Sequence, residues 1–355
     1  MTEMPYQPQT RRPAKAGQLV IDPAAWRAED FREAPPWVLR LSDDEAADIL
    51  EATARVEAAG LDLTEITRED FTLGAAGEVL ARIFRELTEG VGIVQLRGLP
   101  VARLDKRQAA IAFIGIGAHF GRLSSQNAEG HLLGHVKDLG KDYADPMARG
   151  YQTAAAMGFH TDPCDFVALM CLKTARAGGQ SRVVSSPALY NEMMARRPDL
   201  AEELTKDFYF SRHGEVPPGE KPYYKMPVLA FVDGYFFCRG ASAHVRKAQG
   251  LPGVPPFTQA QKDAIDMFQS LADELAVDIP FEEGDFQILC NHVMLHSRRA
   301  FEDWPEQAEK RHLFRLWIQN PGIRPIPDLV REGYKGIEVA GFKPSAPLEA
   351  EIEAV

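Results

Sequence analysis

The N-terminal third of the chain carries its apolar residues at helical spacing. Ser42 and the acidic residues after it mark a helix start, and Gly60 marks its end, so a helix with both ends defined is predicted. A clearer apolar stripe over residues 77–90 predicts a second helix. The short apolar run at 91–100 predicts a buried strand, and a third helix is expected over 103–121.

From about residue 154 the pattern changes, because short apolar runs alternate with turn residues. This spacing is typical of an antiparallel sandwich or barrel. The expected strands lie within residues 166–173, 181–186, 225–234, 235–240, 285–291 and 311–318. Helical patterns interrupt them at 187–205 and 258–276. We therefore expect a mainly β fold with α-helices (α+β), in which a helical N-terminal layer packs on a β core.

The same pattern divides the chain into three parts. Residues 21–330 are expected to form a single domain. Residues 1–20 are polar and proline-rich and are expected to be a flexible arm, whereas the acidic stretch 331–355 is expected to be a peripheral tail. The arm has basic residues but no apolar centre, so it does not have the pattern of a signal peptide.

Composition limits the class of partner. The 355 residues are 45% hydrophobic and 26% charged, which is the balance of a globular protein. With 40 Lys and Arg against 51 Asp and Glu, the formal charge is −11. That charge argues against nucleic-acid binding but permits a local basic pocket for a small anion. No apolar run approaches the ~18 residues of a membrane span, so no membrane partner is expected.

Four cysteines are scattered through the chain and form no CxxC pair. Such usage fits a reducing compartment better than a disulfide framework, and we expect a cytoplasmic protein. A homo-oligomer is compatible with the sequence, although no segment marks an interface.

The strongest local signal for chemistry is His160-Thr161-Asp162. On an extended strand, or at its mouth, residues i and i+2 point to the same face, so this imidazole and carboxylate can bind one metal ion together. Taken alone the pair is weak, because a surface histidine beside an aspartate is as common. His296 follows an apolar strand and a short polar break. Two histidines and one carboxylate hold Fe(II) in non-haem oxygenases and leave positions open for a chelating co-substrate and for oxygen.

Two arginines mark the last expected strand. On an extended strand Arg311, Leu313, Arg315 and Trp317 share one face, and both faces are rich in apolar residues. Buried guanidinium groups are costly unless they meet anions. The arginines would be roughly 13 Å apart, so two anionic groups at different depths of one pocket would account for them. Structural ion pairs with core carboxylates are the alternative.

Four elements in this order resemble one known family. They are the HTD triplet, AGGQS at 177–181, NHVMLH at 291–296 and the arginine pair of RHLFR at 311–315. The set resembles the taurine dioxygenase-like (TauD/TfdA) family of Fe(II)- and 2-oxoglutarate-dependent oxygenases, over roughly residues 90–325. The resemblance implies a catalytic double-stranded β-helix (a jelly roll, cupin-like) with flanking helices.

Within this resemblance, His160, Asp162 and His296 would bind the iron. One departure is visible, since the family often has Asn-Arg where this sequence reads Asn291-His292. His292 therefore competes with His296 as a ligand. The spacing to the arginines favours His296 and leaves a structural role for His292.

The resemblance also implies how the co-substrate binds. Arg311 would pair with the distal carboxylate of 2-oxoglutarate in the fork geometry that suits guanidinium. Ser181 stands where the family usually has a threonine hydroxyl on that carboxylate, and Arg315 would touch the other carboxylate or an anionic group of the substrate. The implied reaction uses O2 to convert 2-oxoglutarate to succinate and carbon dioxide while a small, anionic or zwitterionic substrate is oxidised. Hydroxylation is the default outcome.

Weaker candidates surround this set. The loop 124–140 is expected over the mouth of the active site, with Gln126, Asn127 and His135 as candidate substrate contacts. Arg239 is expected to face either the substrate or solvent.

Two functions of other classes stay open at this point. A β-barrel sensor could hold 2-oxoglutarate or another carboxylate without turnover, although such a protein would be free to lose its metal ligands. A redox-neutral metalloenzyme of cupin type is disfavoured, because its ligand spacing usually includes more histidines and a glutamate.

Overall fold

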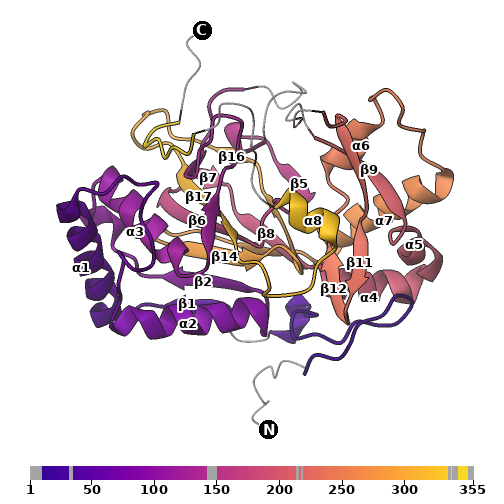
Figure 1. Cartoon of the computed structure of the whole chain (residues 1–355), viewed down its shortest axis with the longest axis horizontal. Coiled ribbons are helices and arrows are strands. Elements are labelled where there is room, and N and C mark those ends of the chain that lie inside the picture. Colours follow the sequence, from indigo (N-terminus) through magenta and orange to yellow (C-terminus); the bar gives the residue numbers. More distant parts are fainter. Residues whose placement is uncertain are drawn as a thin grey trace.

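The structure is a computed structural model of the chain, and the ranges that it describes are 10–31, 35–141, 150–212, 216, 219–334, 337 and 343–350 (Figure 1). Within these ranges, every helix is too short or too polar to span a bilayer.

Two sheets form the centre of the described structure. The larger has the strand order β1-β2-β14-β6-β17-β3, and β4 also pairs with β17. Its strands are β1 Val38–Arg40, β2 Ile93–Arg97, β3 Arg122–Ser124, β4 Gly134–Val136, β6 Phe166–Lys173, β14 Phe286–Cys290 and β17 His312–Gln319. The smaller has the order β13-β8-β15-β5, with β5 Met157–His160, β8 Ser181–Ser185, β13 Val277–Ile279 and β15 Met294–Arg298. Apart from the parallel pair β1–β2, the strands of both sheets pair antiparallel.

Shorter strand pairs and helices complete the described architecture. The pairs are β9 Asp207–Ser211 with β10 Tyr223–Pro227, β11 Leu229–Val232 with β12 Tyr235–Cys238, and β7 Ala177–Gly178 with β16 Phe301–Glu302. The helices are α1 Asp43–Ala59, α2 Ala75–Thr88, α3 Lys106–Ala118, α4 Ser186–Arg196, α5 Pro198–Glu203, α6 Ala243–Ala248, α7 Gln259–Leu275 and α8 Asp328–Gly333. The three-residue helices are η1 Ala28–Asp30, η2 Val101–Arg103 and η3 Gly150–Gln152.

Helices cover each sheet on the side away from the other sheet. The N-terminal helices α1 to α3 lie beside the larger sheet, and α4, α5 and α7 lie at the opposite end of the molecule (Figure 1). Helix α3 packs on β17, where the ring of Phe113 stacks on Phe314, and α4 and α7 pack on β8. The mixed α/β character is therefore as predicted.

Local sequence explains the predicted helices. Ser42 and Glu45 cap α1 reciprocally, and Gly60 ends it in the left-handed region at φ 68°, where a residue without Cβ is favoured. Thr258 caps α7 in the same way. The single helix expected over 187–205 is instead divided into α4 and α5, because Pro198 cannot continue the first helix and opens the second.

The inner faces of the two sheets meet through polar side chains. Ser181 on β8 donates a hydrogen bond to Gln287 on β14. Trp317 on β17 donates one to Asp162, which follows β5. These contacts place the pocket between the sheets.

Both ends of the described chain pack more closely than expected. In the expected flexible arm, Ala14 and Val20 are buried and Arg11 pairs with Asp22; residues 1–9 lie outside the described ranges. In the expected peripheral tail, Tyr334 is buried and Ser345 bridges to His131.

Candidate metal centre and anion pocket

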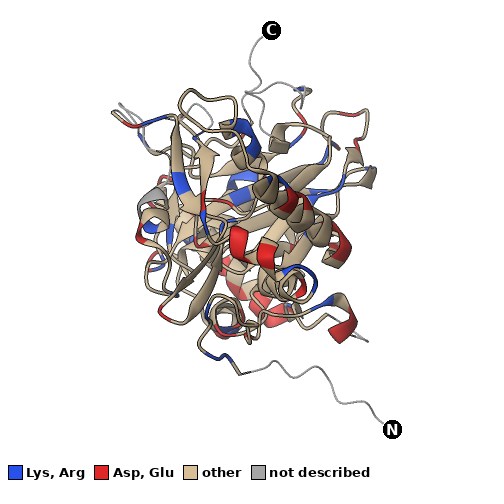
Figure 2. Ribbon diagram, turned by 90° about the vertical axis from the view of Figure 1, so that its right-hand side faces the viewer, with Lys and Arg blue, Asp and Glu red and all other residues tan. Residues whose placement is uncertain are grey.

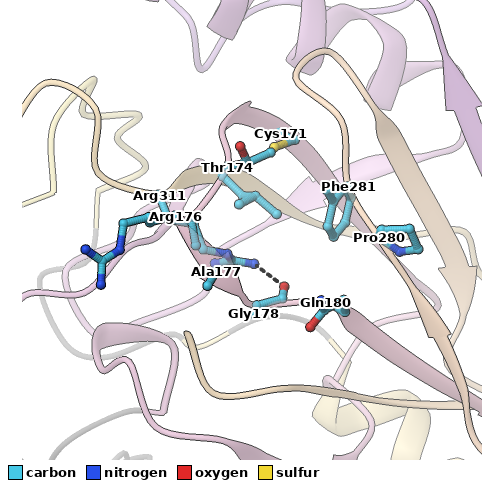
Figure 3. A pocket seen from close by; sticks show the side chains of 12 residues that line it. Cys171, Thr174, Arg176, Ala177, Gly178, Gln180, Pro280, Phe281 and Arg311 are labelled. Atoms are coloured by element: carbon cyan, nitrogen blue, oxygen red, sulfur yellow. Dashed lines mark hydrogen bonds between the residues drawn. The ribbon is translucent and has the colours of Figure 1, made fainter. Parts of the chain in front are cut away.

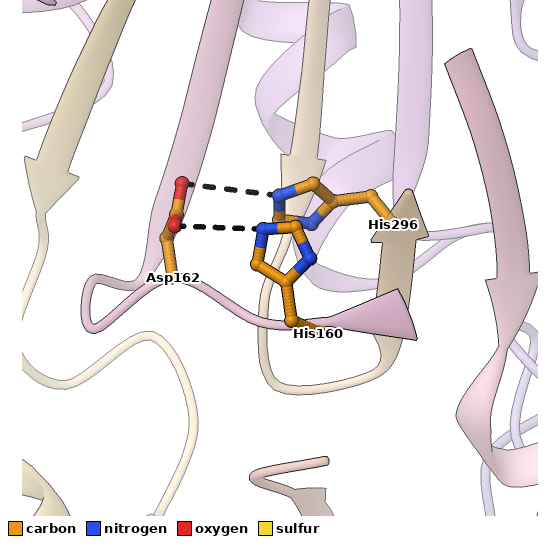
Figure 4. A group of neighbouring side chains, drawn as sticks. All are labelled: His160, Asp162 and His296. Carbon is orange, nitrogen blue, oxygen red and sulfur yellow. Dashed lines mark ion pairs between the residues drawn. The ribbon is translucent and has the colours of Figure 1, made fainter. Parts of the chain in front are cut away.

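Three side chains converge at one edge of the smaller sheet (Figure 4). His160 ends β5, and His296 lies directly opposite it on β15. Asp162 follows two residues beyond the strand end. One ligand atom from each residue lies within 4.8 Å of the others: the Nε2 atoms of His160 and His296 are 4.0 and 3.8 Å from the Asp162 carboxylate oxygens. The structure thus brings together the three residues that the sequence selects as metal ligands.

Strand alternation aims both histidines into the pocket. Their neighbours Phe159 and Leu295 belong to the apolar core on the other side of the smaller sheet, as the twofold period of a strand requires. The Nδ1 of His160 donates to the carbonyl of Gly158 at 2.9 Å. This hydrogen bond leaves Nε2 unprotonated and facing Asp162, which is how a second partner prepares a histidine for a metal.

Electrostatics favour the protonation states that a cation needs. Burial alone would raise the pKa of Asp162, but Arg315, His296 and His160 lower it to about 2. Burial and then the neighbouring His160 lower the pKa of His296 to about 3, and burial lowers the pKa of His160. The group is therefore one carboxylate and two neutral imidazoles near neutral pH, the donor set of a non-haem Fe(II) site.

Arg315 lies beside this group and is held on several sides. Its Nε donates to Oε1 of Gln126 at 2.7 Å, and its Nη1 is 3.6 Å from Asp162 Oδ2. Its guanidinium also lies over the rings of Tyr151 and Trp317, at 4.7 and 5.1 Å from their centroids. Asp162 Oδ2 in turn accepts a 2.8 Å hydrogen bond from Trp317 Nε1.

Arg311 precedes Arg315 by four residues on the same face of the chain and makes fewer contacts. Its guanidinium lies over the ring of Phe301, 5.1 Å from the centroid. Its Nη2 donates to the carbonyl of Gly179 at 3.4 Å, and its buried Nη1 has no partner among the described residues. Burial lowers its pKa to about 10. A cavity of about 310 Å³ adjoins it, bounded by Gly179, Phe281 and Leu313 among others (Figure 3). A buried cation with a free donor beside a cavity suits a carboxylate.

Some of the remaining predicted site residues reach the space between the sheets, and others make contacts elsewhere. Ser181 lies two residues after Gly179 on β8, and its hydroxyl donates to Gln287 Oε1 at 2.8 Å. Gln126 reaches the pocket, where it holds Arg315. Asn127 instead bonds His131 within its own loop.

His135 lies on the wrong side of the larger sheet for a substrate contact. It pairs with Phe314 in register, and its Nδ1 is 2.8 Å from Nε2 of His312 while its Nε2 is 2.8 Å from the carbonyl of Pro347. Because alternate residues of β17 face opposite sides, His135 shares the helix-covered face with Phe314, and Arg315 faces the pocket.

His292 and Arg239 have structural partners close behind the triad. His292 is buried and bonds Asp165 at 2.8 Å, so it stands apart from the cluster that contains His296. Arg239 is also buried, and its Nη1 donates to the carbonyl and hydroxyl oxygens of Thr161 at 3.0 and 2.8 Å. Of the two expectations for Arg239, solvent exposure is wrong.

Sequence reasoning missed three contributors. Trp317 was placed on the arginine face but given no role, and Tyr151 and Gln287 carried no pattern at all. Their positions follow from contacts between segments distant in the chain, which no local spacing encodes.

Comparison with known proteins decides the family. The model of the family described as "Taurine catabolism dioxygenase TauD, TfdA family" matches residues 59–317. The chain belongs to the TauD/TfdA family. As a member it is an enzyme, a dioxygenase of the Fe(II)- and 2-oxoglutarate-dependent kind.

Relatives in this family are similar over most of their length. The chain is 29% identical over 322 residues to FR-33289 synthase of Streptomyces rubellomurinus, covering 89% of this chain and 95% of that one. It is also 29% identical over 329 residues to the taurine hydroxylase-like protein SAT17 of Stachybotrys chartarum, covering 87% and 83%. A uridine-5'-phosphate dioxygenase of a Streptomyces species is 23% identical over 188 residues, covering 49% and 66%.

Solved structures share the fold. An asparagine oxygenase with Fe(II), 3-hydroxyasparagine and succinate superposes with a TM-score of 0.63 at 18% identity, covering 80% of this chain and 93% of that one. The oxygenase OrfP with Fe, succinate and 3-hydroxyarginine also gives 0.63, at 14% identity, covering 81% and 94%.

Proposed function

We propose that this TauD/TfdA dioxygenase binds iron through His160, Asp162 and His296, and 2-oxoglutarate through Arg311. The substrate is a small anionic or zwitterionic molecule. The observations that carry the proposal are the three converging ligands and, four residues before the Arg315 that lies beside them, a buried arginine with an unpartnered nitrogen next to a cavity. The two sheets with their flanking helices support a double-stranded β-helix as the core.

The chain's own residues would divide the work. When bound, iron with 2-oxoglutarate and O2 supplies the oxidising chemistry and releases succinate and carbon dioxide. His160 and His296 would bind the metal as neutral imidazoles, and the Asp162 carboxylate would neutralise part of the charge of the metal. Arg311 anchors the distal end of the co-substrate.

The positive charge of two buried arginines near the triad supports an anionic or zwitterionic substrate. Arg315 is fixed beside the triad with its guanidinium edge near Asp162, and the buried guanidinium of Arg239 lies behind Thr161. The relatives and structural neighbours include proteins whose names or ligands are a nucleotide phosphate and amino acids. We therefore propose that Arg315, with Arg239 behind it, attracts an anionic group of the substrate.

The non-catalytic sensor is less well supported. A protein that only binds a carboxylate has no need of an ionised aspartate and two neutral histidines within 4.8 Å of one another. Each of these groups costs free energy to bury, and a cation recovers it.

We also infer that the enzyme works in the cytoplasm on diffusible substrates. Its four cysteines are free and buried, which suits a reducing compartment in which Fe(II) persists. On the side shown in Figure 2, acidic residues lie on several helices, and the formal charge of the chain is −11. That arrangement supports a small molecule, and not a nucleic acid, as the partner.

The test has two stages. Anaerobic addition of Fe(II) and 2-oxoglutarate should give a weak visible charge-transfer band; folded protein without a band would refute the metal assignment. A succinate-release screen over amino acids, sulfonates, phosphonates, phosphates and small carboxylic acids should then find stimulation by an anionic or zwitterionic compound. Stimulation by neutral compounds alone would refute the substrate class.

A further inference from the structure

The two oxygens of the Asp162 carboxylate have different neighbours. Oδ2 accepts a 2.8 Å hydrogen bond from Nε1 of Trp317 and lies 3.6 Å from Nη1 of Arg315 and 3.8 Å from Nε2 of His296. Oδ1 faces Nε2 of His160 at 4.0 Å (Figure 4), and no hydrogen-bond donor among the described residues reaches it. The protein therefore engages one oxygen and leaves the other available.

Trp317 has no second way to make its hydrogen bond. It lies on β17, is 4% exposed and belongs to the larger apolar core. The guanidinium of Arg315 lies over its ring. An indole carries a single N–H, which donates and cannot accept. Unlike a hydroxyl or an amide, it presents the same group to Asp162 whatever else is bound in the pocket.

The backbone that carries the carboxylate is fixed as well. The N–H of Asp162 donates to Oδ1 of Asn291 at 3.2 Å, and its carbonyl accepts from the N–H of Cys164 at 2.9 Å. The Asn291 amide in turn donates to the carbonyl of Cys164 at 3.0 Å. The terminal torsion of an aspartate is soft, so rotation of the carboxylate is the freedom that remains. The hydrogen bond from Trp317 restricts that rotation.

We propose that Trp317 is a positioning residue of the metal centre, which sets the plane of the Asp162 carboxylate and leaves Oδ1 as the oxygen for the metal. The proposal rests on the proposed function, because it concerns the same iron site. Oδ2 already accepts a hydrogen bond and lies beside a guanidinium, so a cation is bound more favourably by Oδ1. Loss of such a partner of a metal ligand costs about 10- to 100-fold in metal affinity.

The proposal makes a specific prediction for an amide at position 162. In Asp162→Asn, the indole N–H of Trp317 can bond only the amide oxygen, so that oxygen takes the place of Oδ2. The NH2 group then takes the place of Oδ1, where it faces Nε2 of His160 and cannot bind a cation. Asp162→Asn should therefore bind metal no better than Asp162→Ala, although it keeps an oxygen atom.

The metal affinity of the full-length protein tests the proposal independently of turnover. Co(II) is the probe, and its dissociation constant is measured from the visible absorption of the bound ion. Trp317→Phe keeps an aromatic ring but removes the N–H, and it should weaken Co(II) binding about tenfold or more. In the Asp162→Asn background the same substitution should instead strengthen binding, because the freed amide can turn its oxygen toward the metal.

Trp26→Phe is the matched control. It removes another buried indole N–H, which donates to the carbonyl of Val91 at 2.8 Å in the N-terminal layer. This substitution should leave the Co(II) affinity unchanged, so a change in Trp317→Phe alone separates positioning of the ligand from a general loss of packing.

The other outcomes decide against the inference or against the proposed function. Unchanged Co(II) binding in Trp317→Phe would overturn the inference, and so would a double variant that binds no more tightly than Asp162→Asn. Clearly tighter binding by Asp162→Asn than by Asp162→Ala would overturn it as well. That comparison needs no substitution at Trp317 and decides the question should Trp317→Phe fail to fold. Absence of Co(II) binding by the folded wild-type protein would instead refute the proposed function.

Discussion

The two buried arginines, Arg315 beside the metal triad and Arg311 beside the cavity, are held in different ways. Arg315 is bonded to Gln126, lies over two aromatic rings and is within 3.6 Å of a carboxylate oxygen. Arg311 has one long hydrogen bond, one aromatic ring, that of Phe301, at 5.1 Å, no carboxylate in contact with its guanidinium among the described residues, and a buried Nη1 without a partner there. Both are almost fully buried, so the contrast lies in their partners and not in their exposure.

The difference separates a charge that is already compensated from one that awaits a ligand. A compensated guanidinium is rigid and can orient a substrate or shape the field at the metal. An uncompensated one raises the free energy of the folded state until an anion arrives. Stability is thus lower where binding is to occur, as the common conflict between stability and function leads one to expect.

The largest effect is expected when one of the proposed metal ligands is removed. His296→Ala should abolish iron binding and reduce succinate formation well beyond the ~10- to 100-fold that loss of an outer-sphere partner causes. His292→Ala is the matched control, since it removes a histidine four residues away that is more deeply buried than His296. It should retain iron but lose about 1–3 kcal/mol of stability, because Asp165 loses its buried partner. Iron content by elemental analysis distinguishes them, and iron loss in His292→Ala alone would exchange their roles.

The next test compares the arginines directly. Arg311→Met should weaken 2-oxoglutarate binding about 100-fold, because the distal carboxylate loses a charge-assisted partner. Arg315→Met should weaken 2-oxoglutarate binding less than Arg311→Met does, and it should raise the KM of the substrate more. Titration of the anaerobic charge-transfer band measures the first, and initial rates measure the second. If Arg315→Met weakens 2-oxoglutarate binding more than Arg311→Met does, the roles assigned to the two arginines have to be exchanged.

The same two variants should change stability in opposite directions. Without ligands, Arg311→Met should raise the melting temperature by a few degrees, since it replaces an unpaired buried charge with an apolar side chain. Arg315→Met should lower it, because Gln126 and Asp162 lose their cationic partner. Thermal unfolding in the presence of a chelator measures both. A drop in both variants would show that Arg311 is compensated by contacts beyond those described.

The residues that carry this contrast, though not the difference between their partners, were open to prediction from the sequence. The spacing of His160 and Asp162 and the alternation of Arg311 and Arg315 predicted which side chains gather, because both are local properties of extended chain. Capping residues such as Ser42 likewise marked α1 correctly.

The rest depends on contacts that no spacing contains. Strand β15 was not predicted, since His296 and the polar residues after it mask its alternation. His135 was assigned to the pocket because its loop was expected there, whereas pairing of β4 with β17 puts it on the opposite face. The hydroxyl of Ser181 donates to Gln287, 106 residues away.

The smallest expected effect belongs to that opposite face of β17. Burial and then the neighbouring His135 lower the pKa of His312 to about 3, and burial lowers the pKa of His135, whereas both titrate near 6.5 when unfolded. The unfolded state therefore binds more protons below that pH. The stability from these neutral histidines is complete above about pH 6.5 and is lost as the pH falls toward 3.

Urea unfolding of the metal-free protein at pH 7, 6 and 5 measures how steeply the free energy of unfolding changes with pH. His312→Phe removes one of the two titrating rings, so the free energy of unfolding should fall less steeply with decreasing pH, by at most about 1.4 kcal/mol per pH unit. The control Val136→Ala, in the strand that carries His135, should lower stability equally at each pH. An unchanged slope in His312→Phe would mean that His312 binds its proton at the same pH in the folded and the unfolded protein. The outer face would then tolerate a buried charge, as the opposite face does at Arg311, and the contrast between compensated and uncompensated charge would no longer set the arginine face apart.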